Sequence, residues 1–120
     1  VTNALNALIQ RGDERAEFWA RRMVRKLRQS LDAEGRIRLE RLPEYVTRYT
    51  SQPHQEGRSI GALVSYYRLT GDEAALETAV LMTSFALEHC FTKQGALTEK
   101  AGHRSLPETG HHNFRHIQSL

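Results

Sequence analysis

The sequence is poor in several features that would assign it to a familiar class. It has one cysteine, Cys90, so it forms no internal disulfide and no multi-cysteine zinc site. Three prolines and eight glycines exclude a collagen-like or proline-rich chain. No apolar run is long enough to span a membrane, and no signal peptide is visible after Val1. The lack of disulfides favours a cytoplasmic location, with a signal peptide upstream of Val1 as the open alternative.

The remaining composition is that of a soluble globular chain. Hydrophobic residues make up 39% and charged residues 26% of 120 residues. This predicts a single domain over 1–120, or a piece of a larger one. The last residues, Asn113 to Leu120, have the pattern of a helix that has only begun. Because short isolated helices are marginal, we expect a fragment of a longer protein.

Positive charge is concentrated in one segment. Residues 11–41 hold ten Lys and Arg against six Asp and Glu, and most basic residues of the chain are arginine. Arginine suits bidentate contacts with carboxylates and phosphates, although a solvated helix face explains the same pattern. The excess is too small, and too poor in aromatic residues, to predict a nucleic-acid partner.

Hydrophobic periodicity predicts an all-α chain. The expected helices cover 3–10, 14–31, 54–70 and 73–90. In the second helix Trp19, Met23, Leu27 and Leu31 recur every four residues, which places Trp19 in the core. In the third helix the predicted apolar stripe is Ile60, Leu63, Val64 and Tyr67. In the fourth, the predicted inner face is Leu76, Ala79, Val80, Thr83, Leu87 and Cys90.

The connections between these helices alternate between short and long. Thr70-Gly71-Asp72 combines a helix-ending glycine with an N-cap residue, which predicts an antiparallel helical hairpin. Long loops are expected at the other end, and the alternation of Arg36, Ile37, Arg38 and Leu39 predicts a short strand near 36–40.

A faint internal repeat runs through the chain. Residues 54–63 (HQEGRSIGAL) align with 111–120 (HHNFRHIQSL), and residues 31–37 (LDAEGRI) align with 91–97 (FTKQGAL). The offsets, 57 and 60 residues, are nearly equal. They predict one repeated unit of helix, long loop and helix, longer than the common helical repeats.

The segment GRSIGALVSYYRLTGDEAALETA, residues 57–79, resembles the helical pairs of the six-hairpin (α/α) toroid glycosidases. It is most similar to the beta-L-arabinofuranosidase-type glycoside hydrolases, in which a Gly-His pair such as Gly110-His111 begins an inner helix. The likeness covers the layout of about 13–120 and the motifs of 54–82 and 110–120. The Tyr-x-Leu-Thr-Gly-Asp turn is shared by many toroids, including epimerases and lyases, so it specifies fold better than reaction.

The resemblance implies a carbohydrate-active enzyme of which this chain is an incomplete toroid. A full toroid needs about twelve helices, so this segment alone should be inactive. The similar enzymes use a cysteine-rich zinc site with a glutamate, which a lone Cys90 does not supply. No cofactor is therefore visible, and any metal site would lie outside this chain. The expected partners are a carbohydrate substrate and the remainder of its own chain.

The candidate site residues gather at the long-loop end of the helices. Glycoside hydrolysis uses two carboxylates, and Glu56 is the candidate catalytic residue, with interaction with the helix dipole as its structural alternative. The candidate substrate-binding residues are His54, Arg58, His103, His111, His112, Tyr45 and Tyr49. Arg58 could instead pair with Glu56, and the histidines could serve as caps or surface residues. Their spacing matches no metal site.

Two functions follow from these features. The first is a glycoside hydrolase to which this chain contributes substrate contacts. The second is a non-catalytic helical-repeat module that binds a protein or an anionic partner through its first long helix, the basic segment 14–31, with Arg21, Arg22 and Arg25.

Overall fold

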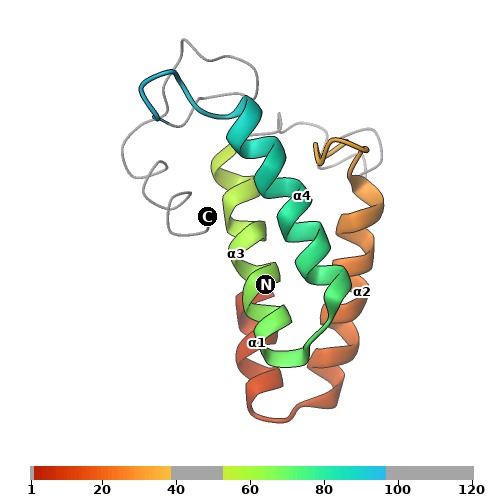
Figure 1. The fold of residues 1–120 in the computed structure, drawn as a ribbon. Helices are drawn as coiled ribbons and strands as arrows, with labels where there is room; N and C mark the ends of the chain where they lie inside the picture. The colour runs from red at the N-terminus through yellow and green to blue at the C-terminus, as the bar shows by residue number, and fades with distance from the viewer. Residues whose placement is uncertain (1, 39–52, 97–120) are drawn as a thin grey trace.

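The computed structural model describes residues 2–38 and 53–96 and shows four helices there (Figure 1). They are α1 (Thr2–Gln10), α2 (Glu14–Ser30), α3 (Pro53–Thr70) and α4 (Glu73–His89). Each begins and ends within one residue of its predicted bounds. The all-α prediction is confirmed for the described part of the chain.

Two short turns make two antiparallel hairpins. Asp13 caps α2 by accepting hydrogen bonds from the backbone N–H groups of Arg15 (2.9 Å) and Ala16 (3.2 Å). Asp72 caps α4 in the same way, accepting from Ala74 N–H at 3.1 Å. Gly71, with φ of 71°, ends α3 in the left-handed conformation, and its N–H donates to the carbonyl of Tyr67 at 2.7 Å. The predicted α3–α4 hairpin is therefore confirmed.

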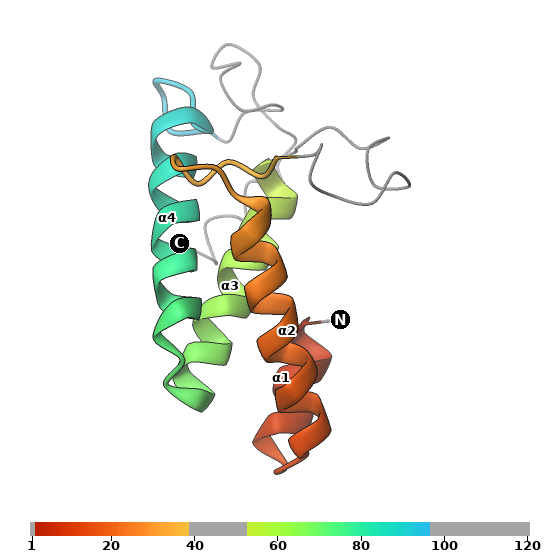
Figure 2. The same ribbon diagram turned by 90° about the vertical axis from the view of Figure 1, so that its right-hand side faces the viewer.

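The two hairpins lie side by side, as Figures 1 and 2 show. Helix α1 packs on α3, and α2 packs on α4. Helices α2 and α4 run in the same direction, so the second hairpin repeats the first after a sideways step. The buried core between them consists of Ala20, Val24, Leu31, Ile60, Leu63, Tyr66, Ala75, Ala79 and Met82.

The prediction that Trp19 belongs to the core is wrong. Its side chain is 55% exposed, and Phe18 and Met23 beside it are exposed as well. The buried stripe of α2 instead runs through Ala16 and Ala20. Small alanine side chains let helices approach closely, and a tryptophan in that stripe would hold them apart.

The predicted inner face of α4 is also partly wrong. Val80 is 56% exposed and Leu87 is 60% exposed, whereas Ala79 and Cys90 are buried as expected. Helix α4 instead turns Met82, Phe85 and several small residues inward, which leaves Val80 and Leu87 at one exposed flank. On α3 the predicted stripe is correct at Ile60 and Leu63, but Tyr66, which the periodicity missed, is buried too.

Both hairpins end in the same turn, as the 31–37 and 91–97 alignment predicts. Asp32 N–H donates to Arg36 O at 3.0 Å, and Thr92 N–H donates to Ala96 O at 2.7 Å. In each turn the side chain of the first residue accepts the N–H four residues later, at 3.0 and 3.1 Å. A glycine with positive φ lies between them, at 93° and 84°. The repeat therefore extends to the backbone of the helix exits.

The strand predicted near 36–40 is not formed within the described residues. Ile37 makes a single antiparallel bridge with Leu31 across the exit turn, and Arg38 N–H donates to Ser30 O at 2.7 Å. The chain thus folds back over the end of α2 in residues 36–38, and the alternation of their side chains arises from this short extended stretch. Residues 39 and 40, and both predicted long loops, lie outside the described residues.

Candidate functional site

Three of the predicted site residues lie in the first turns of α3. Arg58 is exposed there, and His54 and Glu56 precede it on the same helix. The positions of the last two side chains are outside the description. Tyr45, Tyr49, His103, His111 and His112 also lie outside the described residues. The structure therefore places part of the predicted site on one helix start, and the rest of the set lies outside the described residues.

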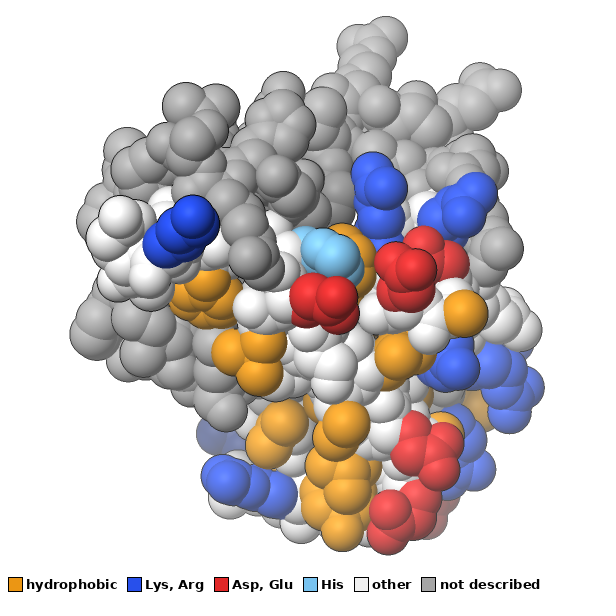
Figure 3. Space-filling view, turned by 45° about the horizontal axis from the view of Figure 1, so that its top comes forward, with side chains coloured by type: hydrophobic (Ala, Val, Ile, Leu, Met, Phe, Trp, Pro, Cys, Tyr) orange, Lys and Arg blue, Asp and Glu red, His pale blue; other side chains and the backbone are white. Residues whose placement is uncertain are grey.

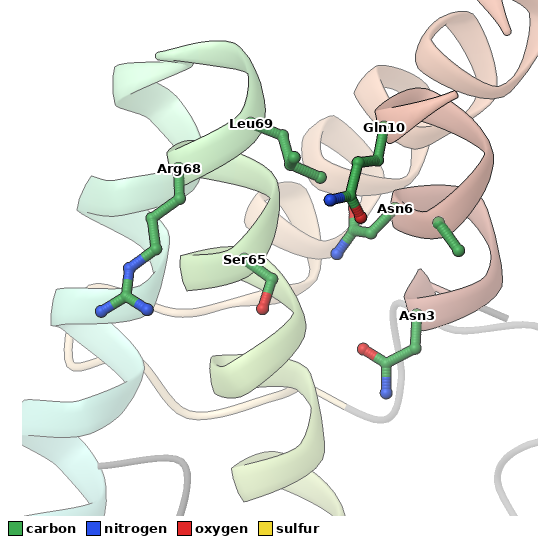
Figure 4. Close-up of a pocket in the computed structure, with 7 residues that line it drawn as sticks. Asn3, Asn6, Gln10, Ser65, Arg68 and Leu69 are labelled. Carbon is green, nitrogen blue, oxygen red and sulfur yellow. The ribbon is translucent and has the colours of Figure 1, made fainter. Parts of the chain in front are cut away.

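A polar groove that the sequence did not reveal lies between α1 and α3 (Figure 4). It has a volume of about 380 Å³. Its lining residues are Asn3, Asn6, Ala7 and Gln10 from α1 and Ser65, Arg68 and Leu69 from α3. The three amide side chains recur at helical spacing and so occupy one face of α1. The regular spacing of these amides was the one sequence feature that could have indicated the groove. Amides on a short amphipathic helix, however, usually indicate a face exposed to solvent.

Asn6 is the best-defined residue of this groove. Its side chain is 6% exposed, and its Nδ2 donates to the carbonyl of Ala62 on α3 at 3.1 Å. Among the described residues, its Oδ1 is buried without a hydrogen-bond partner. A buried acceptor left unsatisfied costs about 1–3 kcal/mol. Because that atom is buried in this structure, a ligand that donates a hydrogen bond would recover the cost only where the Asn6 side chain turns its Oδ1 into the groove.

The chemistry of the groove is that of binding. Amide, hydroxyl and guanidinium groups donate and accept hydrogen bonds at neutral pH without changing protonation state. No carboxylate occurs among the described lining residues, so these side chains supply no acid and no nucleophile for glycoside cleavage. The groove is also distant from Arg58. Ten residues of α3 separate Arg58 from Arg68, which corresponds to about 15 Å along the helix axis.

A second feature lies on the outer face of α2. The rings of Phe18 and Trp19 meet edge to face, with centroids 5.5 Å apart. The guanidinium of Arg22 lies 5.5 Å from the centroid of Trp19 and 5.7 Å from that of Phe18. Such cation–π contacts hold the aromatic rings and the charge in a fixed arrangement at the surface.

Arg21 connects α2 to the second hairpin. Hydrogen bonding to the Tyr66 hydroxyl, and then to the Glu17 carboxylate at 2.9 Å, raises the pKa of Arg21. Burial raises the pKa of Tyr66, although the hydrogen bond from Arg21 acts in the opposite direction. Arg21 therefore faces α3, and the basic face predicted from the sequence is divided between the two sides of α2.

The comparisons with known proteins match no family model, no curated protein and no solved structure. Within the described residues, no helix is long and apolar enough to cross a membrane. The same part of the chain has no group of three or more His, Cys, Asp or Glu residues able to hold a metal ion.

Proposed function

We propose that the chain is part of a carbohydrate-active enzyme, with glycoside hydrolysis as its reaction, and that its own role is to bind the substrate. The observation that carries this proposal is the groove between α1 and α3, which is lined by amide, hydroxyl and guanidinium groups and in which Asn6 Oδ1 has no hydrogen-bond partner among the described residues. Sugar hydroxyls both donate and accept hydrogen bonds, so they match these side chains. The repetition of the hairpin is compatible with an (α/α) toroid.

The groove is tested by titration with a neutral oligosaccharide. The probe is an arabinofuranosyl oligosaccharide, and binding is followed by amide chemical shifts. We expect Gln10→Ala and Arg68→Ala to raise the Kd about tenfold each, because one net hydrogen bond is worth about 1 kcal/mol and one to a charged group about 1.5–3 kcal/mol. Arg28→Ala, an exposed substitution on α2, is the matched control. Unchanged affinity in both groove variants would exclude the groove as a sugar site.

The predicted long-loop end is tested separately. Glu56→Gln, Arg58→Ala and His111→Ala are made in the complete protein, and both binding and hydrolysis are measured. We expect the first to reduce turnover and the other two to weaken binding. If neither these variants nor the groove variants affect a glycoside substrate, the carbohydrate proposal is wrong.

A second function is favoured by the exposed Phe18, Trp19 and Met23 beside Arg22. Aromatic residues, methionine and arginine are enriched at protein interfaces. On this reading the chain is a module that binds an acidic partner through α2. The test is the emission of Trp19 during addition of a synthetic acidic amphipathic helix. A blue shift that Arg22→Glu removes supports this function, and an unchanged spectrum contradicts it.

A further inference from the structure

We propose that copies of this chain associate head to tail, the outer flank of α4 in one copy packing against the outer flank of α2 in the next. The α2 flank is Phe18, Trp19 and Met23 with Arg15, Arg22 and Lys26. The α4 flank is Val80 and Leu87 with Glu73 and Glu77. This inference rests on the second proposed function, binding through α2, and names its partner. It does not depend on carbohydrate binding.

The α2 flank is turned away from the second hairpin. Ala20 is buried in the core, and Arg21, the next residue, interacts with Tyr66 of α3. Trp19 precedes Ala20, so it lies on the opposite side of the buried stripe. At 3.6 residues per turn, Trp19 and Arg21 are about 200° apart around the helix axis. The aromatic side chains therefore extend from the free side of the first hairpin.

The α4 flank is turned away from the first hairpin. Leu81 contacts the exit turn of that hairpin, since a Cβ atom on Gly35 would lie 3.0 Å from its side chain. Val80 and Leu87 lie about 100–120° around α4 from Leu81. Both are more than half exposed. Figure 3 shows hydrophobic side chains running down one face of the molecule with acidic side chains beside them.

The two flanks are complementary in charge. The exposed charged residues of the α2 flank, Arg15, Arg22 and Lys26, are basic. Those of the α4 flank, Glu73 and Glu77, are acidic. Each flank is thus an apolar stripe bordered by charge of one sign, and the signs are opposite. Two α2 flanks or two α4 flanks would instead bring like charges together, which disfavours a symmetric contact.

The arrangement of the two hairpins within one copy shows how a second copy would be placed. Helices α2 and α4 already lie side by side and run in the same direction within one copy. Repeating that sideways step beyond α4 places the α2 of a second copy beside it. Stacked repeats bury their flanks in this way, each unit contacting only its neighbours. A contact between two different surfaces is heterologous, so it builds rings or open chains.

The sole tryptophan makes the contact directly measurable. Trp19 lies in the α2 flank and is the chain's one tryptophan, so its emission reports that surface alone. Sedimentation velocity of the full chain is measured from micromolar to millimolar concentration, together with the emission spectrum. We expect a concentration-dependent increase in mass with a matching blue shift of Trp19. A chain that stays monomeric with an unshifted spectrum overturns the inference.

Two blocking variants test the heterologous geometry. Val80→Asp blocks the α4 flank and Met23→Asp blocks the α2 flank, both at exposed positions. In each variant alone, the dissociation constant for self-association should rise at least tenfold, because every contact needs one intact α2 flank and one intact α4 flank. A mixture of the two variants should form a dimer of one copy of each and nothing larger. In that dimer the intact α2 flank belongs to the Val80→Asp copy, so its Trp19 should show the blue shift. Ala33→Asp, in an exposed turn outside both flanks, is the control and should associate normally.

The outcomes separate this inference from the functions proposed above. Persistent self-association of Val80→Asp shows a contact that does not use the α4 flank and overturns the inference. Failure of the mixture to form a dimer does the same. Binding of the acidic peptide by a chain that stays monomeric would leave the second function in place while excluding a second copy as its partner.

Discussion

The backbone of Gly35 lies directly against the backbone of Leu81, at the point where the first hairpin meets α4. A Cβ atom on Gly35 would lie 2.8 Å from the carbonyl carbon of Leu81 and would touch its oxygen more closely still. Gly95, its counterpart in the second hairpin, has the same left-handed conformation, and no atom of the described residues lies within 4 Å of the equivalent position. Within the described part of the chain, the first turn therefore packs against α4, whereas the second turn, built in the same way, has no such contact.

Substituting these two glycines should separate backbone strain from packing. Gly95→Ala should cost about 1 kcal/mol of unfolding free energy, because alanine is strained at positive φ. Gly35→Ala should cost about 1–3 kcal/mol more, because the added methyl group meets backbone that cannot move aside. Urea denaturation followed by circular dichroism measures both. Equal losses would show that the contact with Leu81 contributes nothing.

The cap of α2 should make stability depend on pH. The backbone N–H of Ala16, followed by the side chain of Arg15, lowers the pKa of Asp13 below 3.8. A carboxyl with a lowered pKa in the folded state adds stability above its unfolded pKa and loses it as pH falls through the folded value. Asp13→Asn should therefore be less stable than the parent chain at pH 7, and the difference should be smaller near pH 3. Denaturant midpoints at both pH values test this, and an equal difference at both would contradict it.

Asp32 should add to the same acid sensitivity. Burial raises the pKa of its carboxyl, but hydrogen bonds from the N–H groups of Arg36 and Glu34 outweigh that effect and leave the pKa below 3.8. Its contribution is likewise present above pH 3.8 and lost below. In Asp32→Asn the stability should fall less between pH 6 and pH 3 than in the parent chain. Amide exchange of Arg36 gives a local readout, since its N–H bonds that carboxylate at 3.0 Å. Protection that does not change with pH would exclude this contribution.

The division of apolar residues between core and flank has a direct energetic consequence. Ile60 is 1% exposed, so Ile60→Ala should cost about 2–5 kcal/mol through lost burial and a cavity. Leu87→Ala, at an exposed position of α4, should change stability by no more than about 0.5 kcal/mol. Thermal unfolding at low concentration, where self-association is absent, compares them. Comparable losses of unfolding free energy at both positions would show that Leu87 is a core residue, which would contradict its exposure.

Cys90 should act as a reporter of opening at the end of α4. Its side chain is fully buried, and its N–H donates to Ala86 O at 2.8 Å. Reaction with a disulfide reagent requires exposure of the thiol, so labelling should follow local or global unfolding. We expect the native chain to react at least about a hundredfold more slowly than the chain in urea. A variant with Ala33→Cys and Cys90→Ser supplies the exposed reference thiol, and equal rates for the two would contradict the burial.

The bounds of the four helices follow from residues that are close together in the sequence. Capping by Asp13 and Asp72 and left-handed glycines such as Gly71 act within a few residues, so their effects follow from local order. The matching exit turns around Gly35 and Gly95 could be recognised for the same reason. Periodicity also identified Ile60 and Leu63 as core residues, because each lies at the centre of its apolar stripe.

The rotation of each helix about its own axis depends instead on contacts between helices. The apolar stripes of α2 and α4 are wide, and their periodicity is equally satisfied whether Trp19 and Leu87 or Ala20 and Ala86 face inward. Close packing selected the small residues, because parallel neighbouring helices approach best where side chains are short. The same contact between α1 and α3 created the groove around Asn6. Such features depend on residues more than fifty positions apart, which local sequence patterns do not encode.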